Sequence, residues 1–114
     1  MTAYRGEIWL ANLNPSRKTN EIGKIRPVVV LQNNNLAING YPTTVIMPLT
    51  TQLIDDACPI RMRISQRERL KRDSDIVISQ VKAIDNSRFI EKIAKLNENE
   101  LSEILSCLQE IISP

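Results

Sequence analysis

Arg26 is the side chain in this sequence that is best placed to bind an anion at a defined position. It precedes Pro27, and the proline ring disfavours a helical backbone at the residue before it, so Arg26 is expected to be extended at the start of a strand. A guanidinium held in this way suits a phosphate group, because its planar donors form a fixed fork. An arginine that pairs with a surface carboxylate is the alternative interpretation.

The segment that leads to this arginine, Asn14–Ile25, has a composition that suits a polyanion. It is about a dozen residues long, whereas hairpin connections usually have about 2 to 5. It holds one acid, Glu21, and a glycine that can act as a hinge, Gly23. Its cations are Arg17, Lys18 and Lys24. Such a loop can close over a polyanion.

The complete absence of histidine excludes several kinds of catalytic site. Ser-His-Asp and Cys-His pairs, HExxH zinc sites and imidazole acid/base couples all need that residue. Cys58 and Cys107 lie far apart in the sequence without a CxxC spacing, and we interpret both as ordinary, buried thiols. The glycine patterns that cradle nucleotide phosphates are absent as well. No cofactor is expected.

The remaining charged clusters have ordinary interpretations. The acids of Asp55-Asp56 and Asp73-Asp75 are expected to be solvated turn residues rather than magnesium ligands, so no metal is assigned. The basic run RERLKR, Arg67–Arg72, is either a solvated loop or a contact for an anionic partner.

Length and charge define the class of protein. A chain of 114 residues predicts one domain, residues 1–114. Residues 1–72 contain eleven Lys/Arg and five Asp/Glu, a charge of +6, whereas residues 73–114 contain four and eight, a charge of −4. The first part therefore attracts anions. Apolar runs are far shorter than the roughly 18 residues that span a bilayer, and residues 1–6 show no signal-peptide pattern, so a cytoplasmic location without membrane contact is expected.

The first two thirds of the chain predict short β-strands, which together favour a small barrel. The predicted strands are Glu7–Leu13, Arg26–Gln32, Thr43–Leu49, Ile60–Ile64 and Asp75–Ile84, the last being one strand or two. Trp9 is expected in the core rather than as a platform for stacked bases. Arg61 and Arg63 alternate with apolar residues and are expected on a solvent-exposed face.

The end of the chain predicts an amphipathic helix. Asn97 is a good N-cap, with Glu100 at the third helical position. The apolar residues that follow on one face are Leu101, Ile104, Leu105, Leu108, Ile111 and Ile112. This face is expected to cover a barrel mouth or to form a subunit contact.

Four stretches, in their order and spacing, carry a family resemblance over nearly the whole chain. They are RGEIWLANLNP (Arg5–Pro15), NEIGKIRPVVVLQN (Asn20–Asn33), TVIMPLTTQ (Thr44–Gln52) and DSDIVISQVKAIDNSR (Asp73–Arg88). They resemble the MazF/PemK family of type II toxin endoribonucleases. The resemblance implies a mainly β fold, a small SH3-like β-barrel with a C-terminal helix. It also implies a homodimer that cleaves single-stranded RNA without a metal and is held in check by an acidic, MazE-like antitoxin.

The resemblance also assigns residues. It matches Arg26 and Thr50 to the family's catalytic arginine and threonine, and Glu21 to an acid that helps to order the site. Gln80 matches a glutamine on a late strand beside the substrate groove. The remaining expected RNA-binding residues are Arg17, Lys18, Asn20 and Lys24.

This sequence departs from the family pattern at three positions. Lys24 stands where many members have a second glycine, and Asn20 where one branch has histidine. Ser79 replaces an acid that some members are proposed to use as a base. The general base is therefore unassigned: Glu21 is the nearest candidate, and ordering Arg26 is its alternative role.

The implied reaction is attack of the RNA 2′-hydroxyl on the adjacent phosphorus, which leaves a 2′,3′-cyclic phosphate and a 5′-hydroxyl. The protein then has to orient the RNA and stabilise charge, and Arg26 and Thr50 are expected to donate hydrogen bonds to the phosphate. The alternatives that share these fold signals are a CcdB-like toxin, which binds DNA gyrase without cleaving anything, and a non-enzymatic SH3-like module.

Overall fold

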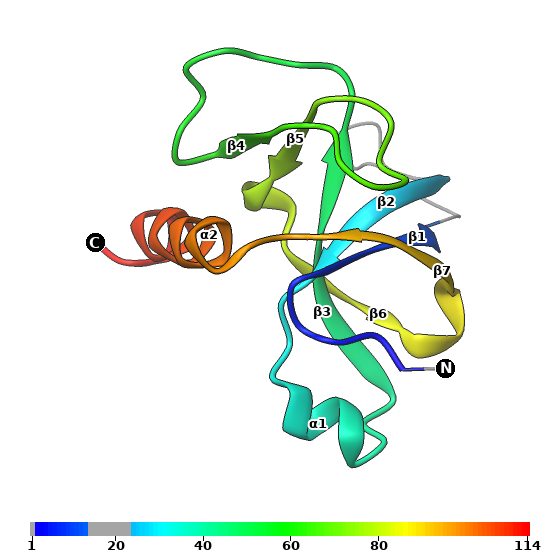
Figure 1. Ribbon diagram of the computed structural model, residues 1–114. Helices are drawn as coiled ribbons and strands as arrows, with labels where there is room; N and C mark the ends of the chain where they lie inside the picture. Colours follow the sequence, from blue (N-terminus) through cyan, green and yellow to red (C-terminus); the bar gives the residue numbers. More distant parts are fainter. Residues whose placement is uncertain (1, 14–23) are drawn as a thin grey trace.

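The computed structural model of the protein describes residues 2–13 and 24–114 (Figure 1). Within these ranges the chain forms seven strands, two α-helices and two short 3-10 helices. In chain order they are β1 (Glu7–Asn12), β2 (Ile25–Val30), α1 (Asn34–Ile38), β3 (Thr43–Thr50), β4 (Arg61–Ile64), β5 (Ser74–Val77), η1 (Ile78–Gln80), β6 (Lys82–Asp85), η2 (Asn86–Arg88), β7 (Phe89–Lys95) and α2 (Glu98–Ile112). The predicted fold class, mainly β with a C-terminal helix, is confirmed.

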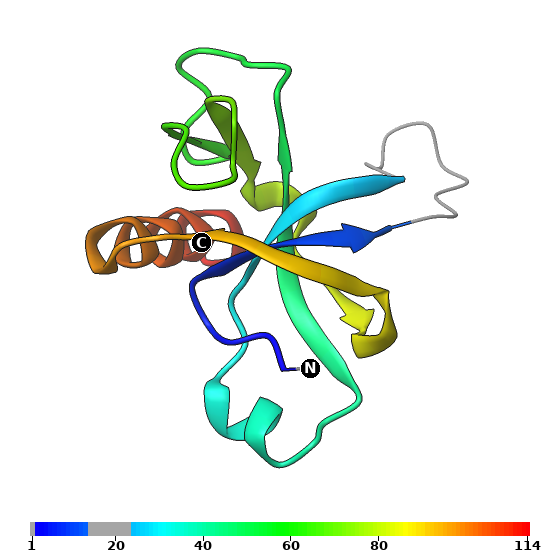
Figure 2. The same ribbon diagram turned by 45° about the vertical axis from the view of Figure 1, so that its right-hand side comes forward.

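The long strand β3 organises the sheet. The strand order is β4-β5-β3-β2-β1-β7, all pairs are antiparallel, and β6 pairs with the first half of β3. β4 and β5 lie at one end of β3 and α1 lies at the other (Figure 1). Figure 2 shows β2, β1 and β7 fanning out beside it with a strong twist. The described strands thus curve into the barrel-like shape that the sequence predicts.

Apolar residues pack on both faces of this sheet. Val29 belongs to one buried cluster, whereas its neighbours Val28 and Val30 belong to the other, so β2 is buried on both sides. In the second cluster Trp9 meets Phe89 edge to face, with ring centroids 5.6 Å apart. The prediction that Trp9 lies in the core is confirmed, since the residue is almost fully buried.

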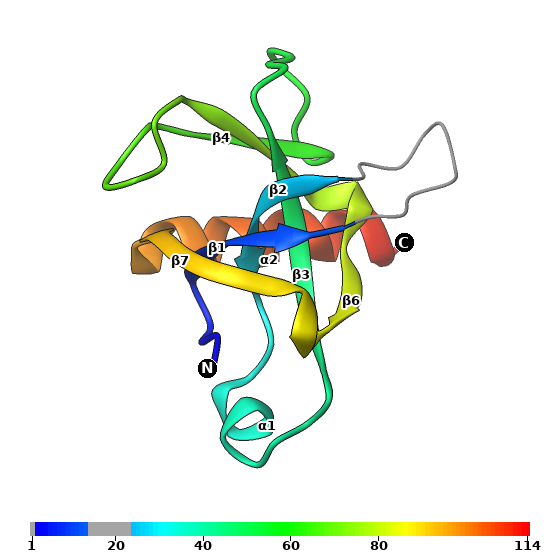
Figure 3. The same cartoon turned by 90° about the vertical axis from the view of Figure 1, so that its right-hand side faces the viewer.

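The terminal helix begins as predicted and covers the first cluster. Asn97 accepts a hydrogen bond from the Glu100 amide, and the Glu100 side chain accepts one from the Asn97 amide, which completes a capping box. Figure 3 shows α2 lying across the sheet behind β1, β2 and β3. Its residues Leu101 and Ile104 are buried within this chain. They therefore pack inside the fold, which agrees with the expectation that this face covers the barrel, and the alternative of a subunit contact stays a prediction.

Gly6 directly precedes β1 and packs against Leu101 of this helix. Its φ of +88° lies in the left-handed region, and a Cβ at this position would approach Leu101 Cδ1 to 3.0 Å. Its amide donates to the Val30 carbonyl, and its carbonyl accepts from the Leu96 amide. Both the backbone conformation and the close contact therefore favour glycine.

Several expectations about individual residues are wrong. Gln80 lies in η1 and not on a strand, because β5 ends at Val77. Asp75 is fully buried and not a solvated turn residue. Arg61 and Arg63 do lie on the more exposed face of β4, as predicted, but both also pair with Asp75. The two thiols are not alike either: Cys107 is buried, but Cys58 is exposed.

No helix in the described part of the chain has the length and apolar character required to cross a membrane.

Candidate functional site

Arg26 and Thr50 occupy neighbouring strands at the same level of the sheet. The pairing of β2 with β3 ends at Val28 and Pro48, and Arg26 and Thr50 each lie two residues beyond this last pair, at the same end of the two strands. Arg26 is half-buried and Thr50 is buried. Val28 and Pro48 are directly opposed and share a face, and residues two apart on a strand project from the same face, so the guanidinium and the hydroxyl lie on one face. The fold thus places the two residues that the family resemblance pairs at the same end of neighbouring strands.

Asp75 extends this row and was not predicted as a site residue. Asp75 belongs to β5, where it lies directly opposite Thr50 of β3 on one side and directly opposite Arg63 of β4 on the other. The paired row across the sheet is therefore Thr50, Asp75 and Arg63, with Arg26 at the same end of the neighbouring strand β2. Only the register of three strands reveals it, and no local sequence signal marks the acid at position 75.

The Asp75 carboxylate accepts three hydrogen bonds. Its Oδ1 accepts from Arg63 Nε at 2.8 Å, and its Oδ2 accepts from the Ile54 amide at 2.9 Å and from Arg61 Nη1 at 3.3 Å. Burial alone would raise its pKa, but the hydrogen bonds from Arg63, the Ile54 amide and Arg61 hold the pKa below its usual value. Asp75 is therefore charged at neutral pH and is a poor proton acceptor.

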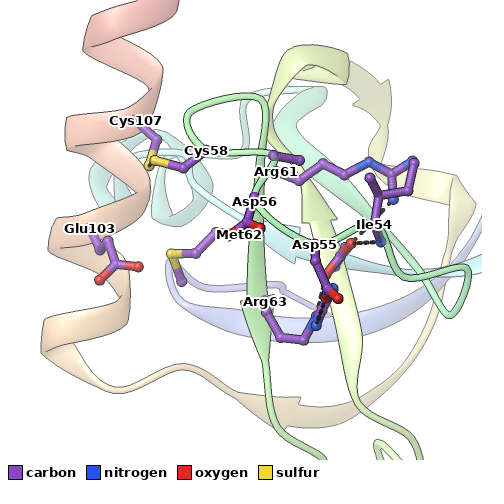
Figure 4. A pocket seen from close by; sticks show the side chains of 11 residues that line it. Ile54, Asp55, Asp56, Cys58, Arg61, Met62, Arg63, Glu103 and Cys107 are labelled. Atoms are coloured by element: carbon purple, nitrogen blue, oxygen red, sulfur yellow. Dashed lines mark hydrogen bonds and ion pairs between the residues drawn. The ribbon is translucent and has the colours of Figure 1, made fainter.

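The chain turns immediately after Thr50, and the Thr50 hydroxyl forms a hydrogen bond within that turn. Thr50 Oγ1 accepts a hydrogen bond from the Gln52 amide at 3.1 Å, and Arg61 Nη1 donates to the Gln52 carbonyl at 2.9 Å. Arg63 Nη1 donates to Asp55 Oδ1 at 2.7 Å. Figure 4 shows Arg61 and Arg63 meeting the segment that carries Ile54 and Asp55. One network of contacts thus runs from the Thr50 hydroxyl to the buried carboxylate.

A hollow of about 490 Å³ lies next to the chain neighbours of the arginine and the threonine, although neither Arg26 nor Thr50 lines it. Pro27, the neighbour of Arg26, and Thr51, the neighbour of Thr50, both line it. Its basic lining residues, Arg69, Lys71 and Arg72, come from the run RERLKR. This run is thus not wholly solvated: Leu70 is buried, Arg67 pairs with Glu100 and Arg69 pairs with Glu91. A cationic, partly apolar hollow can accept a phosphate together with a base.

Of the other predicted site residues, the structure describes two, Lys24 and Gln80. Lys24 is exposed next to β2 and has a φ of +66°, a conformation that favours the glycine found there in many family members. Gln80 is half-buried at the end of η1. The remaining predicted site residues lie outside the described residues; they are Arg17, Lys18, Asn20 and Glu21.

A second hollow, of about 500 Å³, lies between the segment 54–58 and α2 (Figure 4). There the sulfur of Cys58 lies 3.9 Å from that of Cys107, although 49 positions separate the two in the sequence. Burial, the neighbouring Cys58 and the charges of Glu103 and Glu110 raise the pKa of Cys107 to about 11. Within the described ranges, no three acidic, cysteine or histidine residues group closely enough to hold a metal ion.

This arrangement defines a class of protein: a small, curved antiparallel sheet backed by a C-terminal helix, with a polar row at the strand ends of one face. A sequence profile described as PemK-like, MazF-like toxin of type II toxin-antitoxin system matches residues 4–112. The chain therefore belongs to the PemK/MazF toxin family.

Solved structures of low sequence identity share the fold. MazF from Deinococcus radiodurans superposes with a TM-score of 0.78 at 19% identity, covering 100% of this chain and 99% of that one. The Mycobacterium tuberculosis toxin MazF-mt6 gives 0.74 at 15% identity, covering 91% and 93%. An endoribonuclease from a mycobacterial species, in complex with its cognate antitoxin, gives 0.70 at 13% identity, covering 96% and 91%.

Proposed function

We propose that this toxin is a metal-independent, sequence-specific endoribonuclease that cleaves single-stranded RNA, in particular mRNA, in the cytoplasm. The observation that carries the proposal is the placement of Arg26 and Thr50 on one face at the same end of neighbouring strands, in a chain of the PemK/MazF family. That a mycobacterial structure with this fold is an endoribonuclease adds support. A gyrase-binding toxin would need neither an arginine nor a hydroxyl in this arrangement.

The proposed reaction uses the RNA's own 2′-hydroxyl as the nucleophile. The 2′-oxygen attacks phosphorus in line, the bond to the 5′-oxygen breaks, and the products are a 2′,3′-cyclic phosphate and a 5′-hydroxyl. Arg26 donates hydrogen bonds to the phosphate oxygens as negative charge builds, and the Thr50 hydroxyl donates to the same group. Arg26 does not act as a base, because a guanidinium keeps its proton in proteins. Glu21 either acts as the general base that accepts the proton of the 2′-hydroxyl, or orders Arg26.

RNA binding is proposed to use the basic surface around this pair. The hollow lined by Arg69, Lys71 and Arg72 lies next to the neighbours of Arg26 and Thr50. Lys24 and Gln80 join it, as do the residues of the first loop, Arg17, Lys18 and Asn20. Because most of these contacts are with phosphates, RNA affinity is expected to fall steeply with added salt.

The proposed partners are an acidic, MazE-like antitoxin and a second copy of the chain. An acidic, flexible segment would compete with RNA for Arg26 and the basic loop. The apolar residues that α2 leaves exposed, Leu105, Ile111 and Ile112, are available for the homodimer. A toxin saturated with antitoxin is then expected to bind no RNA, and light scattering at micromolar concentration is expected to give a dimer. Unchanged RNA affinity in the complex would contradict the shared site, and a monomer would contradict the dimer.

The test of the activity is incubation of the purified protein with single-stranded RNA in EDTA, followed by mass spectrometry of the fragment ends. We expect fragments with a cyclic phosphate and a 5′-hydroxyl, and none from an Arg26→Ala variant with the same circular dichroism spectrum. Fragments with 5′-phosphates would contradict this mechanism. Intact RNA together with binding to gyrase would favour the CcdB-like alternative.

A further inference from the structure

The acid that completes the row across the sheet, Asp75, has contacts that all lead to the chain segment after Thr50. Its side chain is 1% exposed, and two arginines of β4 neutralise it. The third donor is the amide of Ile54, in the segment that follows β3. A buried carboxylate with its arginines is costly to desolvate, and apolar residues of similar volume are often as stable. The contribution of these contacts to stability therefore does not explain their presence, and their position beside the turn after Thr50 points to a role for them.

These contacts fix the peptide that holds the Thr50 hydroxyl. The Gln52 amide donates to Thr50 Oγ1, and the carbonyl of the same residue accepts from Arg61. The same Nη1 of Arg61 also donates to Asp75. Gln52 is thus held at both of its backbone polar groups, one by Thr50 and the other by the arginine that Asp75 orients.

The direction of the hydrogen bond at Thr50 matters for chemistry. Since the hydroxyl oxygen accepts from Gln52, the hydroxyl hydrogen points away from that amide and can be donated to another acceptor. If the turn moved, the hydroxyl would rotate with it, and small displacements of a donor from the reacting phosphate reduce rates steeply.

We propose that Asp75 is a positioning residue: together with Arg61 it holds the turn after β3 so that the Thr50 hydroxyl is aimed at the scissile phosphate. This inference rests on the proposed ribonuclease function. It makes the acid and the arginine part of the catalytic arrangement although neither touches RNA.

The experiment is a double-mutant cycle read by single-turnover cleavage of an RNA oligonucleotide. Asp75→Asn keeps the shape of the side chain and an acceptor for the Ile54 amide, but it removes the charge that orients Arg61. We expect its kcat to fall about 10-fold or more with KM within about twofold, because alignment is lost and binding is not. In a Thr50→Ala background the same change is expected to cause no further loss.

A control and a second variant separate alignment from stability. Glu100→Gln removes a carboxylate from another partly buried arginine pair, in which Arg67 Nη1 lies 2.5 Å from Glu100 Oε1. It is expected to lower the melting temperature but to leave kcat unchanged. If Asp75→Asn does not fold, Arg61→Lys keeps a positive charge but loses the fork, and it is expected to lower kcat in the same way.

The outcomes are distinct. Equal losses of kcat in the wild-type and Thr50→Ala backgrounds would mean that Asp75 does not act through Thr50, and they would overturn the inference. Unchanged kcat in a folded Asp75→Asn or Arg61→Lys variant would also overturn it. If the wild-type protein does not cleave RNA, it is the proposed function that fails.

Discussion

Replacement of Thr50 by valine isolates the contribution of one hydroxyl group. Valine keeps the branched shape of threonine at a position that is 7% exposed, and it removes the only polar atom of the side chain. In the folded protein that atom accepts a hydrogen bond from the Gln52 amide, and in the proposed reaction it donates one to the phosphate. The two functions have different magnitudes, and they can therefore be separated.

The cost to folding is small. One lost hydrogen bond contributes about 0.5 to 1.5 kcal/mol, and the exposed Gln52 can bond to water instead. For a chain of this size, about 3 to 6 °C of melting temperature corresponds to each kcal/mol, so the melting temperature should fall by less than about 9 °C. Loss of a donor to the transition state costs roughly 100- to 1000-fold in kcat, or about 2.7 to 4 kcal/mol.

The assay is single-turnover cleavage of a fluorescent single-stranded RNA at 25 °C in EDTA, with melting curves of the same samples. Thr50→Ser is the matched control, since it keeps the hydroxyl and is expected within about tenfold of the wild-type kcat. A folded Thr50→Val protein that keeps more than about a tenth of that rate would refute the assigned role. A serine variant as slow as the valine variant would show that the hydroxyl is not what matters.

Three further predictions concern stability and the thiols. The pKa of Asp75 is lowered on folding, so its stabilising effect is complete above the unfolded value of about 3.9 and is lost as the pH falls through the folded value. Urea unfolding should therefore show the largest difference between the wild type and Asp75→Asn at pH 7, and a smaller one near pH 3. Ile104→Ala should cost about 2 to 5 kcal/mol because the side chain is fully buried, whereas Ile112→Ala should cost less than about 0.5 kcal/mol; equal urea midpoints would contradict the packing of α2. A low-molecular-weight disulfide should oxidise Cys58 and Cys107 to one intramolecular disulfide, seen by mass spectrometry as the loss of two hydrogen atoms, and two mixed disulfides instead would contradict their proximity.

The elements that the sequence predicted well are those whose signal is local. The run Val28–Val30 is β-branched and apolar throughout because β2 is buried on both faces, and this is visible without any partner strand. The capping box of α2 lies within four consecutive residues, Asn97–Glu100. Such signals do not depend on tertiary contacts, and they predicted both elements to within a residue or two.

The elements that were missed lack such a signal. β7 has no regular alternation of buried and exposed residues, because its register against β1 shifts twice, between Ile8 and Trp9 and again between Leu10 and Ala11. α1 has five residues and none of them is buried, so it shows no apolar period. The assignment of Gln80 to a strand failed because an apolar run continues from β5 into η1 without a change of composition.

The candidate site was predictable only in part. Arg26 was predicted from its place before Pro27, and Thr50 was assigned through the family resemblance. The alternation in β4 correctly put Arg61 and Arg63 on one face, but it could not show what that face meets. The buried Asp75 depends on the pairing of β5 with both β3 and β4, which is a tertiary property.

The pairing of β1 with β7 has a consequence for synthesis of the chain on the ribosome. Among the described strands β1 is made first and β7 last, and their register pairs Glu7 with Lys95. Until Phe89–Lys95 has been translated, one edge of β1 has no partner strand within the described fold. An open edge invites pairing with other chains. The nascent protein thus carries an aggregation-prone edge through most of its translation, and only the arrival of its last strand covers it.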